Sequence, residues 1–117
     1  MILTVPLPPN AANARRHWRV ALKEKKAYWE RLALMKRPPP DCYLPPLVAH
    51  ISVTMYVHNI MDPDNAMARL KPLLDWLVAW DYIADDSPKA LKWAGLPEQV
   101  IDRKNPRVVL EIKSIAE

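Results

Sequence analysis

The chain has 117 residues, of which 50% are hydrophobic and 26% charged, a composition typical of one globular domain (1–117) and not of a disordered chain. One cysteine excludes an internal disulfide and a multi-cysteine zinc cluster, and one glycine excludes a glycine-rich phosphate loop. The sequence has no apolar stretch near the length of a membrane span and no apolar segment typical of a signal peptide, so we expect a cytoplasmic protein.

The net charge of +4 is distributed unevenly. Residues 1–37 carry nine Lys and Arg against two Glu, whereas residues 38–117 carry eight basic and eleven acidic residues. A basic first third beside an acidic remainder indicates a surface that binds a polyanion next to an acidic site. A solvent-exposed basic helix without a partner would show the same charge pattern.

The first half of the chain predicts a strand, a helix and a second strand. Residues 2–5 form a short apolar stretch that ends at a proline. Residues 15–35 have apolar side chains at helical spacing, and the prolines at 38–40 end this helix. Every second residue of 47–57 is apolar, which predicts a strand with one face in the core.

The second half predicts a helix and a final strand. Residues 65–80 have a helical pattern in which Pro72 either kinks the helix or marks its true first turn. We expect a turn and a short helical piece over 85–93, a last strand over 107–115, and only a weak signal for a fourth strand within 85–102. This order predicts an α+β fold, a small mixed β-sheet with two main helices.

Four aspartates carry the candidate chemistry. If the segment is extended, Asp62 and Asp64 project from the same face, about 7 Å apart at Cα, and Pro63 favours that conformation. Hard oxygen ligands of this kind suit Mg²⁺, which uses few protein carboxylates and keeps several waters. Asp85 and Asp86 could complete a cluster able to bind metal and to stabilise displacement at a phosphodiester.

Each of these acids also has a structural interpretation. An Asp-x-Asp at a strand end is common turn and N-cap chemistry, so Asp64 or Asn65 could cap the next helix. Asp85 and Asp86 could cap a short helix in the same way. Trp18 lies among arginines and could stack on a base, although core packing is the more common use of tryptophan.

Geometry leaves the origin of the third acid open. A straight helix over 65–80 would run about 24 Å, and five or six returning residues reach at most about 17–20 Å. Asp86 therefore reaches Asp64 within one chain only if the helix is bent or begins late. Otherwise, the third acid comes from a partner subunit.

Taken together, the motifs resemble the RusA family of Holliday junction resolvases, found mainly in prophages and bacteria. The resemblance covers nearly the full length. It begins with Leu7-Pro8-Pro9-Asn10, continues through a strand into Asp62-Pro63-Asp64-Asn65, and then reaches Lys71 and Asp75 on a helix. The pair Asp85-Asp86 and a final strand complete the order.

The resemblance implies a small homodimer that resolves four-way DNA junctions with Mg²⁺, or Mn²⁺ in its place, during recombination and repair. By motif match, the essential acids fall on Asp62, Asp64 and Asp86, which would hold the metal with support from Asp85. Lys71 matches the essential lysine and would neutralise charge that develops on the phosphate.

Two departures from the family pattern bear on the cations. Lys71 follows Asp64 by seven residues where the best-known member of the family has four, so Arg69 is a rival for its role. The stretch 58–61 before the acids lacks the arginine run that the best-known member has there. We expect the following residues to contact DNA phosphates: Arg15, Arg16, Arg19, Lys23 and Arg69.

Two other functions remain open from the sequence. One is a non-catalytic phage remnant that binds branched DNA without cutting it. The other is a small interaction protein in which the acids serve as helix caps.

Overall fold

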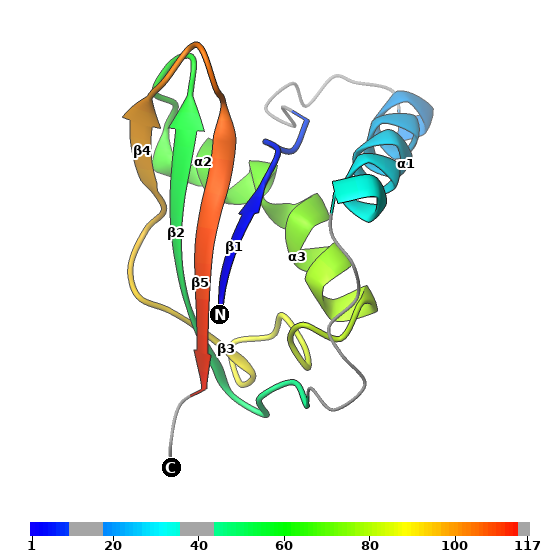
Figure 1. Ribbon diagram of the computed structural model, residues 1–117, viewed down its shortest axis with the longest axis vertical. Coiled ribbons are helices and arrows are strands. Elements are labelled where there is room, and N and C mark those ends of the chain that lie inside the picture. The colour runs from blue at the N-terminus through cyan, green and yellow to red at the C-terminus, as the bar shows by residue number, and fades with distance from the viewer. Residues whose placement is uncertain (10–17, 36–43, 115–117) are drawn as a thin grey trace.

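The structure, a computed structural model, describes residues 1–9, 18–35 and 44–114 (Figure 1). It has the predicted α+β class, with the helices packed on one side of a five-stranded mixed sheet. The elements in chain order are β1 (Ile2–Val5), α1 (Trp18–Met35), β2 (Ala49–Val57), α2 (Pro63–Arg69), α3 (Lys71–Ala79), β3 (Leu91–Trp93), β4 (Glu98–Ile101) and β5 (Arg107–Ser114).

The centre of the sheet is formed by β2. Strand β5 lies antiparallel between β2 and β1, with Ile51 opposite Ile112. The other edge of β2 is shared by two short parallel strands, because β3 pairs with Ala49–Ile51 and β4 pairs with 54–57. Strand β3 therefore lies beside the beginning of β2, and β4 lies beside its end.

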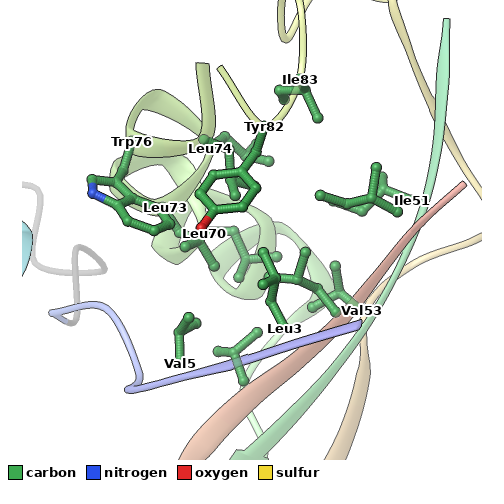
Figure 2. Packing of buried hydrophobic residues seen from close by; sticks show 14 of the residues in the cluster. Leu3, Val5, Ile51, Val53, Leu70, Leu73, Leu74, Trp76, Tyr82 and Ile83 are labelled. Carbon is green, nitrogen blue, oxygen red and sulfur yellow. The ribbon is translucent and has the colours of Figure 1, made fainter. Parts of the chain in front are cut away.

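Apolar alternation places one face of the sheet in the core, as predicted for β2. The buried side chains of that strand are Ala49, Ile51, Val53, Met55 and Val57. The buried side chains of α3 belong to the same core. The ring centre of Trp76 on α3 lies 4.9 Å from that of Trp80 and 5.3 Å from that of Tyr82, two residues that follow the helix. Figure 2 shows the side chains of the sheet and of α3 pointing toward one another in this core.

The predicted second helix is broken in two at Leu70. The Leu70 N–H bonds to the Met67 carbonyl oxygen, three residues back, and the next helix begins at Lys71 with Pro72 in its first turn. The N–H groups in the first turn of a helix have no carbonyl partner within that helix. A proline in this position therefore costs no helical hydrogen bond. Of the two alternatives for Pro72, the first-turn position is confirmed.

Helix α1 buries a narrow apolar face. Tyr28 and Leu32 are buried, whereas Ala21 is exposed. Several predictions for this part of the chain lie outside the described residues, namely those on Arg15, Arg16, the side chain of Trp18 and the prolines at 38–40.

Two predictions about local structure are wrong. Residues 85–93 contain no helical piece: all of them are described, and they form turns followed by β3. The open edge of β2 offers a strand partner to the end of this segment. The local sequence pattern gives no information about that long-range pairing, which explains the difference. Leu47 was expected in the core and is 86% exposed, because β2 begins only at Ala49.

Among the described residues, no helix is both long enough and apolar enough to cross a membrane.

Candidate functional site

Lys71 lies between two carboxylates at the start of α3. Its Nζ is 2.6 Å from Oδ2 of Asp86 and 3.2 Å from Oδ1 of Asp75, one helical turn further along. The hydrogen bond to Asp86 and then that to Asp75 raise the pKa of Lys71 above its ordinary value. The structure thus brings together the lysine and one of the acids that the sequence predicts for one site.

Asp75 connects this contact to α1. Lys25 of α1 donates to Oδ2 of Asp75 at 3.0 Å, while its ammonium lies 5.1 Å from the ring centre of Trp29. Burial alone would raise the pKa of Asp75, but the hydrogen bonds from Lys25 and Lys71 outweigh it and lower the pKa. We call the four residues Lys25, Asp75, Lys71 and Asp86 the lysine–aspartate network.

Asp85 supports its neighbour through the backbone. Its Oδ1 accepts the N–H of Asp86 at 2.9 Å, which fixes the turn that carries Asp86 toward Lys71. All residues between α3 and β3 are described, and they contain no helix. The suggestion that Asp85 and Asp86 cap a short helix is therefore wrong.

Asp62 and Asp64 lie at the start of α2. Asp62 occupies the N-cap position with φ −57° and ψ 145°, and among the described residues its carboxylate makes no capping hydrogen bond. The helix begins at Pro63, so Asp64 and Asn65 lie within its first turn and neither is the N-cap residue. Both carboxylates are exposed, and negative charge is favourable at a helix N-terminus.

Gln99 fixes the backbone that leads into Asp62. Its side-chain nitrogen donates to the Met61 carbonyl oxygen at 2.8 Å, and its oxygen accepts the Met61 N–H at 2.9 Å. Gln99 lies opposite the buried Met55 in the register of β4 and β2. Sequence reasoning missed this residue, and the only available signal was an amide on an otherwise apolar strand face.

The two pairs of aspartates are connected to different levels of β2. Gln99 holds the Asp62 end level with Met55, near the end of β2, whereas Ala90, four residues after Asp86, bonds to Ala49 at its beginning. Along β2, Ala49 and Met55 are six residues apart, which corresponds to about 20 Å of strand.

A shared metal needs a much shorter separation between its ligands. Mg²⁺ binds oxygen at about 2.0–2.1 Å, so two ligand atoms of one ion lie about 4 Å apart or less. In the described part of the chain, no group of three or more His, Cys, Asp or Glu side chains is placed to hold a metal ion. The donors have the right chemistry for Mg²⁺, but a single copy does not assemble Asp62, Asp64 and Asp86 around one ion.

Arg69, the rival cation, has a structural role. Its Nε donates to the Pro8 carbonyl oxygen at 2.8 Å, and partial burial lowers the pKa of its guanidinium. The buried Tyr28 hydroxyl likewise donates to the Pro6 carbonyl oxygen at 2.7 Å. Together they fix the N-terminal segment against the helices, which leaves Lys71, with 61% of its side chain exposed, as the more accessible cation.

Two of the other predicted DNA contacts, Arg19 and Lys23, lie on α1. Arg19 and Lys23 are exposed one turn apart, as is Lys26 further along the helix. This part of the expected basic surface is present, while Arg15 and Arg16 fall in the segment that the structure does not describe.

Comparison with known proteins adds no assignment. No protein-family model matches this sequence, and no curated protein matches it. The resemblance to the resolvases therefore rests on the motif residues themselves.

Proposed function

We propose that the protein is a RusA-like, Mg²⁺-dependent endonuclease that cuts four-way DNA junctions, with Mn²⁺ as an alternative ion. The observation that carries the proposal is the contact between Lys71 and Asp86. The Lys-x-x-x-Asp motif and the Asp-Asp motif are separate in sequence, and folding joins them in one network of charges.

The exposed acids at the start of α2 support the same function. Asp62 lies at an N-cap position, yet among the described residues it makes no capping bond. Helix capping therefore does not account for this carboxylate, which argues against an interaction protein whose acids are only caps. An exposed carboxylate pair with hard oxygen donors is suited to a divalent cation.

In this proposal, the residues have separate tasks. Lys71 stabilises negative charge that develops on the scissile phosphate, and Asp75 and Asp86 keep its ammonium in place. Arg19 and Lys23 on α1 contribute phosphate contacts, which give affinity without reading sequence. A homodimer suits the approximate two-fold symmetry of a four-way junction.

The test is cleavage of a labelled synthetic four-way junction with and without Mg²⁺, beside a linear duplex of the same sequence. We expect paired nicks in the junction that require Mg²⁺ and disappear with Asp64→Asn, while junction binding persists. A matched control is Asp81→Asn, which removes an exposed carboxylate from the turn after α3, outside both acidic pairs.

The other outcomes separate the alternatives. Salt-sensitive binding to the junction without any Mg²⁺-dependent product would favour the DNA-binding remnant. If the protein neither binds nor cuts the junction, the nuclease is rejected and the resemblance has no functional meaning. Cutting by Asp64→Asn at the wild-type rate would reject the assigned acids.

A further inference from the structure

We propose that the open face of the sheet carries a second phosphate-binding surface, formed by Lys113, His50 and Lys92, which holds a further arm of branched DNA. This inference deepens the proposed function and rests on its assignment of DNA as the substrate. It is carried by the register of the sheet, which places the three side chains in one row across β5, β2 and β3. We call these three residues the basic row.

The register aligns the basic row on one face of the sheet. His50 of β2 lies opposite Lys113 of β5 on one side and opposite Lys92 of β3 on the other. The sequence neighbours Ala49 and Ile112 are buried in the core, and side chains alternate between the two faces of a strand. The basic row therefore points to the face that no described helix covers (Figure 1).

The two lysines of the basic row keep their charge available. Lys92 is exposed, and its Nζ donates to the Pro88 carbonyl oxygen at 2.6 Å, a neutral partner that fixes the ammonium without cancelling its charge. The side chain of Lys113 is 68% exposed, and its Nζ lies 2.9 Å from Oε1 of Glu111. Ion pairs at such exposed positions are weak, so a phosphate can take the place of the carboxylate.

The length of the basic row matches the repeat of a DNA backbone. Neighbouring strands lie about 4.8 Å apart, so the row extends about 10 Å from β5 to β3. One strand of a duplex carries a phosphate about every 3.4 Å along the helix axis, so this length corresponds to about three successive phosphates. Two ammonium groups with a ring N–H between them therefore suit one DNA strand laid across the sheet.

The basic row and the basic residues of α1 face different directions. Arg19 and Lys23 are exposed on α1, which lies on the side of the sheet that the helices cover (Figure 1). One straight duplex cannot lie against two opposite faces of a protein, whereas the arms of a branched DNA diverge and can contact both. The basic row therefore takes an arm that α1 does not contact, and the two surfaces together favour branched DNA over linear DNA.

Salt-dependent binding tests the basic row without requiring cleavage. The variant Lys92→Gln/Lys113→Gln removes both charges, and its affinity is measured for a synthetic four-way junction and a linear duplex, without Mg²⁺ and over a range of NaCl concentrations. Each lost phosphate contact reduces the slope of log affinity against log salt by about 1. We expect the slope for the junction to fall by about 2, and the slope for the duplex, which α1 still binds, to remain unchanged.

Two further variants make the test specific. Arg103→Gln/Lys104→Gln is the matched control, because it removes the same charge from exposed side chains between β4 and β5, outside the basic row. It should leave the slope for the junction close to that of wild type. Glu111→Gln makes the opposite change, since it removes the carboxylate that Lys113 contacts, and junction binding should become tighter.

The outcomes distinguish this inference from the proposed function. An unchanged junction slope in the Lys92→Gln/Lys113→Gln variant of a protein that cuts, or an equal fall in the matched control, would overturn the basic row alone. An equal fall for the junction and the duplex would overturn the assignment of a second arm. The expected fall in a protein that never cuts would support the basic row and reject the nuclease. A wild type that binds neither DNA would overturn both.

Discussion

Gln99 is the residue whose replacement tests the structure most sharply outside the charged groups. Gln99→Met keeps the length of the side chain and removes both hydrogen bonds to Met61. Each hydrogen bond contributes about 0.5–1.5 kcal/mol. Because the bonds are only partly buried and methionine adds apolar contact on the core face, we expect a loss of about 1–2 kcal/mol in the free energy of unfolding.

Urea and thermal unfolding measure this loss. For a chain of this size, a change of 1 kcal/mol lowers Tm by about 4 °C, so the expected fall is about 4–8 °C. Glu98→Met is the matched control, because it places the same side chain at the neighbouring, exposed position, where we expect a change within about 0.5 kcal/mol. Since Met61 leads directly into Asp62, junction cleavage should also fall in Gln99→Met and not in Glu98→Met. Equal stability of the two variants would refute the reasoning.

Two further predictions concern stability. Tyr28→Phe removes the buried donor to the Pro6 carbonyl oxygen, and we expect urea unfolding to show a loss of about 1–2 kcal/mol; an unchanged midpoint would show that this bond does not hold the N-terminal segment. Because the folded-state pKa of Asp75 lies below its unfolded value, its contribution is present above the unfolded pKa and is lost as pH falls through the folded pKa. The free energy of unfolding of wild type should therefore exceed that of Asp75→Asn at pH 7, and the two should converge as the pH falls through the folded-state pKa; a gap that stays constant throughout this acidic range would contradict the ion pairs with Lys25 and Lys71.

The local pattern of apolar residues predicted a strand correctly where one face of that strand is buried. The alternation in 49–57 predicts the core face of β2 correctly, because side chains of a strand alternate between faces whatever the strand pairs with. The strand at Ile2–Val5 and the last strand are confirmed for the same reason, apart from Ile115, which lies outside the described residues.

Long-range pairing explains most of what the sequence did not predict. Strands β3 and β4 are only three and four residues long, and they exist as partners for an edge of β2 some forty residues earlier in the chain. The role of Gln99 depends on that pairing, since the strand places its amide beside Met61. The contact of Lys25 with Asp75 depends in turn on how α1 packs against α3.

The candidate site was predicted as a set of residues and not as an arrangement. Lys71, Asp75 and Asp86 were identified from the motifs that resemble the resolvase family, and Lys71 contacts both aspartates. The separation of Asp62 from Asp86 could not be read from the sequence, because a bent helix or a partner subunit would satisfy the same spacing. The helix is broken at Leu70, yet no group of three or more acidic or other ligand side chains in the described part of the chain is placed to hold a metal ion.

The most direct test of the central claim compares two lysines of the same network on the four-way junction. Lys71→Met and Lys25→Met each remove one lysine from Asp75, but only Lys71 also contacts Asp86. We expect Lys71→Met to abolish Mg²⁺-dependent paired nicking while junction binding and folding persist, and Lys25→Met to retain most of the nicking. Equal cleavage by the two variants would contradict the assignment of Lys71 and Asp86 to a nuclease site.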